Sequence, residues 1–290
     1  MKRITIVGLG LIGGSVAKEI AQVKSGLDLI GVEANPAHAE EALSLGLVHK
    51  VLPLQEAVRQ SDVVVLAIPV NAITRILPEM LDILAPEAVV IDLGSTKSQL
   101  CAAVKEHPKR GQYVAAHPIA GTENTGPKAA FVGLFRGKIN IICEQEKSSP
   151  QALAIAAELF DILGMNTTYM SPEQHDRQLA YTSHLSHVSA FMLSTTVMKK
   201  GEEEEDLFAL AGSGFASAVR LAKSSPAMWA PIAEQNVEYL NQALSEYIAQ
   251  LQRFQRHLQN KDIPGLFELM KEANNISPLL DRISKSHPIK

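Results

Sequence analysis

RITIVGLGLIGGS, from Arg3 to Ser15, is the stretch from which the rest of the chain can be interpreted. Its β-branched and apolar residues up to Val7 predict a short strand, and the glycines that follow predict a tight turn. A helix is expected to begin near Leu11. Strand, glycine turn and helix in this order are typical of the first unit of a dinucleotide-binding sheet.

The spacing Gly8-x-Gly10-x-x-Gly13 gives each glycine a separate task in such a unit. Gly8 permits the tight turn, Gly10 lets the backbone approach a pyrophosphate, and Gly13 lets the helix pack closely on the strand. The start of the helix, at Leu11 and Ile12, offers unpaired N–H groups and a partial positive charge to the phosphates. These five residues are therefore predicted to bind the cofactor, the alternative being a tight turn without a ligand.

A second strand is predicted from Leu27 to Glu33, and its last residue follows Gly13 at the distance that the dinucleotide fingerprint requires. The carboxylate of Glu33 is placed to accept hydrogen bonds from the adenosine ribose and to repel a 2′-phosphate. Ala34-Asn35-Pro36-Ala37 adds no cation, so NAD is favoured over NADP. The alternative is that Glu33 is a solvent-facing strand end.

The composition describes a globular chain with a sizeable core, because 46% of its 290 residues are hydrophobic and 20% are charged. A net charge of −4 without a run of Lys and Arg argues against a nucleic-acid surface. Cys101 and Cys143 belong to no metal-binding or CxxC pattern, which predicts reduced core cysteines. Since Met1-Lys2-Arg3 leads into a strand and no apolar run is long enough to span a membrane, we expect a soluble, cytoplasmic protein.

Alternation of strands and helices continues well beyond the first unit and predicts a doubly wound, Rossmann-type α/β sheet. Ligands of such sheets lie beyond the carboxyl ends of the strands, which places Ile68 and Pro69 among the predicted cofactor contacts. The predicted helices are 37–45 and 150–163, and the further strands are 48–52, 62–68, 88–93, 113–116, 138–143 and 166–170.

The same rule singles out the two loops that follow strands 88–93 and 113–116. In the first loop, Ser95 or Thr96 is expected to cap the N-terminus of a helix. The second begins with His117-Pro118 and reaches Glu123. A histidine at a strand end, beside a serine-bearing loop and a carboxylate, is a candidate general base, and a purely structural histidine is the alternative.

From Pro172 onward apolar residues recur only at helical spacing. The chain is therefore predicted to comprise a dinucleotide-binding domain, 1–170, and an all-α domain, 171–290. So much apolar surface on helices favours pairing with a second copy, so a homodimer is expected. The predicted helices are 172–199, 207–221, 226–258 and 263–284.

Three polar side chains of the helical part are candidates for function. His184 and His187 lie on one face of the first helix at spacing i, i+3. They lack the spacing of a zinc-binding helix and an obvious third ligand, so no metal is expected, and substrate contact or core packing remains. Arg220, flanked by apolar residues, either extends its charge to solvent or binds an anion through two hydrogen bonds.

Taken together, these segments resemble the prephenate/arogenate dehydrogenase family of tyrosine biosynthesis. The segment HPIAGTE, starting at His117, is the specific one, whereas the glycine loop alone would not single out this family. The matching segments are GLGLIGGS from Gly8, DLGSTK from Asp92, HPIAGTE from His117, HD at His175, SHLSH from Ser183 and RLAKSSPAMW from Arg220.

The resemblance implies NAD-dependent oxidative decarboxylation of a cyclohexadiene. His117 would take the proton of the ring hydroxyl as hydride leaves the same carbon for the nicotinamide, and loss of CO2 would make the ring aromatic. Ser95 would contact that hydroxyl and help to orient His117. Arg220 would bind a substrate carboxylate, and the other residues implied at the substrate are His187, Glu123, Thr122 and Trp229.

The sequence departs from the family pattern in two places. Family members often have an acidic and a basic residue just before the substrate arginine, where this chain has Gly214 to Val219, and Ser186 replaces a common proline. Arogenate, which carries an amine in place of the keto group of prephenate, is the alternative substrate. A 3-hydroxyacid dehydrogenase or imine reductase is disfavoured, since its catalytic lysine has no counterpart before Lys199, and a non-catalytic NAD sensor would not need Ser95, His117 and Arg220 together.

Overall fold

The structure is a computed structural model that describes residues 2–24, 26–204 and 206–286, without the side chains of 282–286. The chain forms two compact units, Met1–Asn236 and Val237–Lys290. The domain boundary predicted between 170 and 171 is a different division and stays a prediction. Within the described ranges, no helix is long and apolar enough to cross a membrane.

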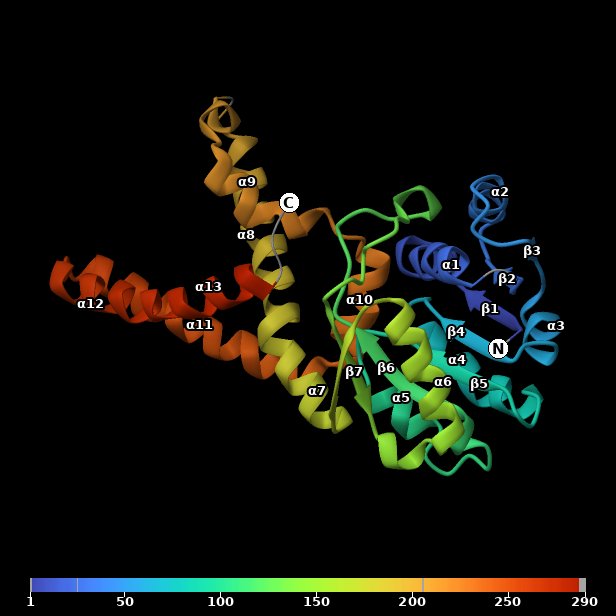
Figure 1. The fold of residues 1–290 in the computed structure, drawn as a ribbon. Helices are drawn as coiled ribbons and strands as arrows, with labels where there is room; N and C mark the ends of the chain where they lie inside the picture. Colours follow the sequence, from blue (N-terminus) through green and yellow to red (C-terminus); the bar gives the residue numbers. More distant parts are fainter. Residues whose placement is uncertain (1, 25, 205, 287–290) are drawn as a thin grey trace. The chain divides into compact units, whose positions relative to one another are not determined.

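The first unit is built on an eight-stranded sheet with the order β3-β2-β1-β4-β5-β6-β7-β8 (Figure 1). All neighbours are parallel except β6 and β7, which are antiparallel. The order reverses between β1 and β4, and ligands of doubly wound sheets bind at such a switch point. The strands are β1 Arg3–Val7, β2 Asp28–Val32, β3 Lys50–Val51, β4 Val63–Leu66, β5 Val89–Asp92, β6 Tyr113–Pro118, β7 Ile139–Cys143 and β8 Asn166–Met170.

Helices cover both faces of this sheet, so its central strands are apolar on both sides, as the sequence predicted. The helices of the first unit are α1 Leu11–Val23, α2 Pro36–Ser44, α3 Leu54–Arg59, α4 Val70–Ile83, α5 Ser98–Ala103, α6 Pro150–Ile162, α7 Pro172–Leu179, α8 Leu185–Gly201, α9 Ser213–Val219 and α10 Pro226–Gln235. Those of the second unit are α11 Val237–Gln259, α12 Ile263–Ala273 and α13 Ser277–Ser286.

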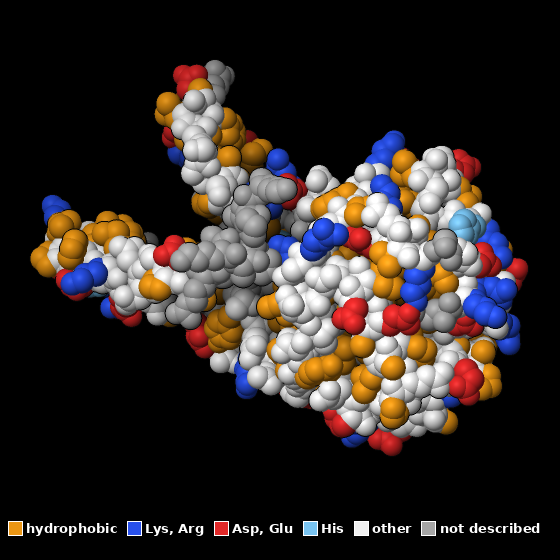
Figure 2. Space-filling model, in the orientation of Figure 1, with side chains coloured by type: hydrophobic (Ala, Val, Ile, Leu, Met, Phe, Trp, Pro, Cys, Tyr) orange, Lys and Arg blue, Asp and Glu red, His pale blue; other side chains and the backbone are white. Residues whose placement is uncertain are grey.

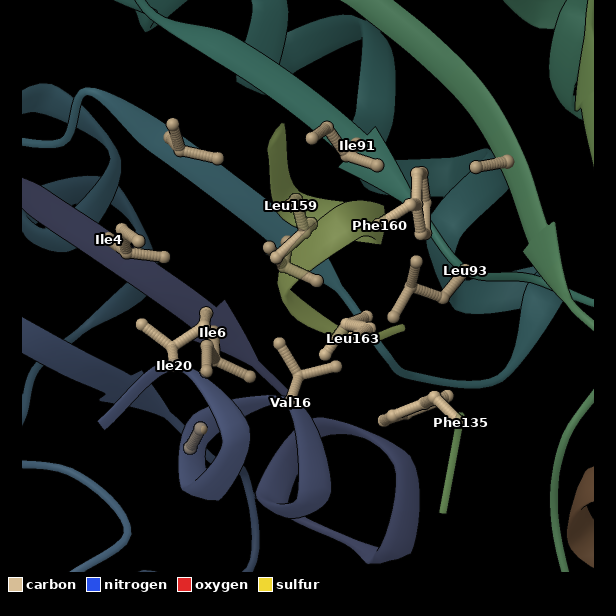
Figure 3. Packing of buried hydrophobic residues seen from close by; sticks show 14 of the residues in the cluster. Ile4, Ile6, Val16, Ile20, Ile91, Leu93, Phe135, Leu159, Phe160 and Leu163 are labelled. Carbon is tan, nitrogen blue, oxygen red and sulfur yellow. The ribbon is translucent and has the colours of Figure 1, made fainter. Parts of the chain in front are cut away.

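Two hydrophobic cores lie on the two faces of the sheet. On one face Ile6 and Ile91 pack with Val16 of α1 and with Leu159 and Phe160 of α6 (Figure 3). The other core joins the opposite side chains of the strands to α4, α5 and Leu179 of α7. Since α7 belongs to this second core, the first helix after residue 170 is anchored directly on the sheet.

Several predicted helices are interrupted. The helix predicted at 172–199 is divided into α7 and α8 by a π-helical segment, Ala180–His184. The single helix predicted at 226–258 is wrong, because Asn236 leaves helical geometry (φ −116°, ψ 30°) between α10 and α11. The helix predicted at 207–221 is also wrong: it consists of the 3-10 turns Leu207–Leu210 and Arg220–Lys223 on either side of α9.

The last predicted helix, 263–284, is likewise broken, by a 3-10 turn at Asn274–Ile276 between α12 and α13. The strand predicted at 48–52 is present, but only Lys50 and Val51 have strand geometry, while the N–H groups of His49 and Leu52 on either side donate to β2. It is an edge strand with one neighbour, and Pro53, at the start of α3, stops its continuation.

Candidate active site

The glycine loop between β1 and α1 has the geometry that its sequence predicts. Gly8 has a positive φ of 91°, and a Cβ there would lie 2.5 Å from the carbonyl oxygen of Ala67. A Cβ on Gly13 would collide with the carbonyl oxygen of Gly8, whereas one on Gly10 would meet nothing within 4 Å. Gly10 therefore faces open space at the N-terminus of α1, where Leu11 and Ile12 begin the helix.

This loop fits the pyrophosphate of a dinucleotide. The first N–H groups of a helix have no partner within it, and they carry the positive end of the helix dipole. Open space beside Gly10 leaves room for phosphate oxygens to approach these groups. Ile68 lies next to the loop, because a Cβ on Gly8 would be 2.7 Å from its Cγ2 atom, and Pro69 precedes α4.

Glu33, just past the end of β2, holds the loop from the other side. Its carboxylate accepts hydrogen bonds from the backbone N–H of Leu9 (2.9 Å) and of Asn35 (3.0 Å). A carboxylate has about four acceptor positions, so two remain for the hydroxyl groups of a ribose. Asn35 caps α2 through its own side chain.

His117, near the end of β6, belongs to a buried chain of hydrogen bonds. Its Nδ1 lies 2.8 Å from Nε2 of His175, and Nδ1 of His175 lies 2.8 Å from Oδ1 of Asp176. Burial, followed by the nearby His175, Lys97 and His184, lowers the pKa of His117 well below its ordinary value. His117 is therefore neutral at physiological pH, as a general base must be.

Asp176 also fixes the loop that carries Ser95. Its two carboxylate oxygens accept from the backbone N–H groups of Lys97 and Ser98, both at 2.8 Å, at the start of α5. The prediction that Ser95 or Thr96 caps this helix is therefore wrong, because the capping carboxylate comes from α7, 78 residues away from Ser98. Thr96 instead donates to the side chain of Gln235 at 2.7 Å.

Below this loop lies a buried ion pair that the sequence analysis missed. Lys97, whose side chain is 0% exposed, donates to Asp92 at the end of β5 and to the carbonyl oxygen of Ala116 (2.6 Å). Tyr113 donates to the other oxygen of Asp92 at 2.6 Å. Removing one member of such a buried pair lowers protein stability by about 3–5 kcal/mol. Through Lys97, the pair connects the residue before His117 to the Ser95 loop.

The two histidines predicted to share a helix face do so, and they meet Trp229 of α10. His187 stacks on the indole at 3.6 Å between ring centroids, and His184 contacts it edge-on at 5.8 Å. His187 donates from Nδ1 to the carbonyl oxygen of Ser183 (3.0 Å). Asn236 donates to Nδ1 of His184 (3.0 Å), and burial lowers the pKa of His184 to about 4.

Arg220 is half exposed and pairs with Glu123 of the loop that follows His117, at 2.9 Å. Thr122, next to Glu123, is exposed and accepts from the N–H of Asn124 (3.2 Å). The loop after β6 therefore links the predicted base to the predicted anion-binding arginine. Both residues lie in the first compact unit.

Among the predicted site residues, the structure pairs Arg220 with Glu123 and stacks His187 on Trp229. The partner that holds His117 was not assigned from the sequence. Ser95 was expected to help orient this ring, but the bonded partner of His117 Nδ1 is His175. The adjacent pair His175-Asp176 was the only signal in the sequence, and 58 residues separate His175 from His117.

A resident metal was not expected. Across the ranges that the structure describes, no group of three or more His, Cys, Asp or Glu side chains is arranged to hold one. Cys101 and Cys143 are buried free cysteines, as predicted, and burial raises the pKa of the Cys143 thiol to about 12.

Comparison with known proteins places both parts of the chain in one family. A family model described as the nucleotide-binding domain of prephenate dehydrogenase matches residues 16–169. A second model, described as the dimerization domain of prephenate dehydrogenase, matches residues 171–272.

Individual relatives resemble the chain over almost its whole length. It is 32% identical to a cyclohexadienyl dehydrogenase of Zymomonas mobilis, covering 94% of each chain. It is 30% identical to a prephenate dehydrogenase of Bacillus subtilis, covering 94% of this chain and 74% of the relative. A solved prephenate dehydrogenase from A. aeolicus, in complex with hydroxyphenyl propionate and NAD+, has a TM-score of 0.85 at 30% identity and covers 97% of this chain and 98% of that one.

Proposed function

Because the chain belongs to the prephenate dehydrogenase family, we propose that it oxidises and decarboxylates prephenate to 4-hydroxyphenylpyruvate with NAD. The observation that carries this proposal is His117, a buried, neutral imidazole at a strand end, bonded through Nδ1 and therefore left with Nε2 for the substrate. Oxidation of a carbinol carbon needs a base at the hydroxyl, and this histidine supplies it.

In the proposed reaction, His117 accepts the proton of the ring hydroxyl. A nicotinamide bound beyond the strand ends would take up the two electrons and the hydrogen from the same carbon. The resulting carbonyl withdraws electrons as CO2 leaves, and the oxygen recovers a proton when the ring becomes aromatic. No proton is consumed overall, so His117 is neutral again at the end.

We propose that the substrate side of the site is formed by residues of the loops after β5 and β6 and of the helices after β8. Arg220 would bind a substrate carboxylate through two parallel hydrogen bonds. In this structure the guanidinium of Arg220 is paired with the carboxylate of Glu123. His187, stacked on Trp229, would line the pocket, and Ser95 would contact the ring hydroxyl. Thr122, at the outer part of the same loop, completes the proposed set. Hydroxyphenyl propionate in the A. aeolicus protein carries the ring and carboxylate that such a set recognises.

We propose NAD as the cofactor in preference to NADP. Glu33 supports this choice, because its carboxylate would repel a 2′-phosphate and has acceptor positions free for ribose hydroxyls. Gly8, Gly10, Gly13, Leu11 and Ile12 would hold the pyrophosphate, with Ile68 and Pro69 beside it.

We further propose that residues 171–290 form a helical substrate and dimerisation domain and that the protein is a cytoplasmic homodimer. The match to a dimerization domain supports this, as do large apolar side chains exposed on α8 and on the turn that follows it (Figure 2). Surfaces of this kind in a soluble protein mark an interface. The exposed residues are Met192, Leu193, Met198, Phe208 and Leu210.

Arogenate is the second candidate substrate. One relative at 32% identity is named a cyclohexadienyl dehydrogenase, and prephenate and arogenate are both cyclohexadienes. The two differ only at the side chain, an amine in place of a keto group, which leaves the chemistry at the ring unchanged.

The test is a parallel assay of the purified full-length chain with each substrate and each cofactor, following the absorbance of reduced nicotinamide. We expect turnover with prephenate and NAD and a higher kcat/KM than with NADP. A higher kcat/KM with arogenate than with prephenate would make arogenate the assigned substrate. No turnover with either compound would refute the proposed reaction.

A further inference from the structure

We propose that His175 and Asp176 are positioning residues that hold His117 in the tautomer with its proton on Nδ1, so that Nε2 is the atom that takes the substrate proton. This inference rests on the proposed role of His117 as the base. It concerns a different part of the site, the contacts behind the imidazole.

The starting point is that Asp176 can only accept hydrogen bonds. Three nitrogen atoms lie 2.8 Å from its carboxylate: the backbone nitrogens of Lys97 and Ser98, which donate, and Nδ1 of His175. Burial raises the pKa of Asp176, but the contacts with His175 and Ser98 lower it by more, so the group is ionised. Because an ionised carboxylate has no proton to give, Nδ1 of His175 must carry the proton of that bond.

The second step concerns the other nitrogen of His175. Burial is the largest influence on this imidazole and keeps its pKa below the ordinary value, although the hydrogen bond and charge of Asp176 act to raise it, and the positive charge of Lys97 opposes a second proton. A neutral imidazole that is protonated on Nδ1 has a lone pair on Nε2. The atom that faces His117 is therefore an acceptor.

It follows that His117 must be the donor of the bond between the two histidines. With Nδ1 and Nε2 only 2.8 Å apart, the other tautomer of His117 would set two lone pairs against each other. A proton on Nδ1 leaves Nε2 of the neutral ring as its one basic atom. The carboxylate of Asp176, at the far end of this chain of hydrogen bonds, thus determines which atom donates in each bond.

The same carboxylate connects the base to the Ser95 loop. Asp176 holds the N–H groups that follow Thr96, and Lys97 in turn binds the carbonyl oxygen of the residue before His117. The base, the serine loop and α7 are therefore joined in one hydrogen-bonded network. When His117 takes up a proton, its Nδ1–H still donates to His175, whose other ring nitrogen is bonded to the negatively charged Asp176.

The direct test is the ¹⁵N spectrum of the histidine side chains in the full-length protein at neutral pH. We expect His117 to show a protonated Nδ1 and an unprotonated Nε2, with the signal assigned by its absence from His117→Asn. A proton on Nε2, or on both nitrogens, would overturn the inference. This measurement needs no turnover, so it separates the inference from the proposed reaction.

Kinetics of two variants at position 175 supply the second test. His175→Leu removes the acceptor, and we expect kcat to fall about 10- to 100-fold, as when a partner that orients a functional histidine is lost. His175→Gln places an amide oxygen near the position of Nε2, so it should recover part of kcat and keep the Nδ1–H signal of His117. NAD affinity should be the same in both variants.

His49→Gln is the matched control, because His49 lies beside β2 and β3 at the edge of the sheet, and its Nδ1 accepts from the N–H of Leu29. It should have wild-type kinetics. A folded His175→Leu protein with unchanged kcat would refute the positioning role. Equal losses of kcat for Leu and Gln, with the Nδ1–H signal of His117 absent from the Gln variant, would do the same.

Discussion

Replacing His117 by Asn removes the proposed base while keeping its main contact. The amide nitrogen of Asn overlays the Nδ1 position of an imidazole, so it can still donate to Nε2 of His175, which lies 2.8 Å from that position. The substitution deletes Nε2, the atom that we assign to the substrate proton. It therefore tests the chemistry and not the positioning of the strand end.

The expected loss of kcat is about 10²–10⁴-fold, the usual contribution of a general base. At about 1.4 kcal/mol per factor of ten, this corresponds to roughly 3–5 kcal/mol of transition-state stabilisation. Stability should change much less, since loss of a small part of a ring that is 8% exposed costs on the order of 1 kcal/mol. A typical domain has about 5–15 kcal/mol of stability, so the variant should stay folded.

The assay follows reduced nicotinamide with prephenate and NAD, while titration calorimetry gives the affinity for NAD. In the wild type, kcat/KM should stay constant as the pH falls and should decrease only well below the ordinary histidine pKa, because burial and the neighbouring His175, Lys97 and His184 lower the pKa of His117. The residual kcat/KM of the Asn variant should lack this decrease at low pH, the acid limb of the profile. A kcat within a few-fold of the wild type, with the limb intact, would show that another group takes the proton.

Three further results are expected. Arg220→Ala should raise the KM for prephenate by about 10-fold or more, and Arg220→Lys should not restore it, because a lysine cannot form two parallel hydrogen bonds to one carboxylate; an unchanged KM in steady-state kinetics would remove Arg220 from the site. Glu33→Gln keeps an acceptor for one loop N–H but removes the charge, so it should increase kcat/KM with NADP relative to NAD more cleanly than Glu33→Ser; a constant ratio would assign the preference to another residue. Because the folded pKa of His184, about 4, lies below the ordinary value of 6.5, the unfolded state binds more protons between these values, and stability falls as the pH drops through this window. The loss from this residue should reach about 2 kcal/mol at about pH 5, and urea unfolding of His184→Gln should show a correspondingly weaker pH dependence.

Predictions that depended on neighbouring residues agree with the structure. The glycine loop, the start of α1 at Leu11 and the strands at the centre of the sheet follow from local turn chemistry and from apolar runs that only a doubly covered sheet can bury. His184 and His187, on either side of the junction between the π-helical segment and α8, both contact Trp229, as their spacing of i, i+3 predicts.

Predictions about where helices stop, and about what caps them, were less successful. The break at Asn236 is stabilised by the bonds of its side chain to the carbonyl oxygen of Asp176 and to His184, which come from another helix. The cap of α5 was assigned to Ser95 or Thr96 from local propensity, but the acceptor is Asp176. Local sequence patterns cannot predict partners that come from distant parts of the chain.

The sequence by itself determined the dinucleotide-binding fold, the family and the identity of the polar residues at the strand ends, because these depend on spacing along the chain. Only the tertiary structure decided which nitrogen of His117 is held, which carboxylate lies behind it and how Lys97 is neutralised. The physical reason is that hydrogen-bond direction and charge pairing in a buried site depend on atoms within 3 Å of one another, and folding brings these together from segments with no periodic relation in sequence.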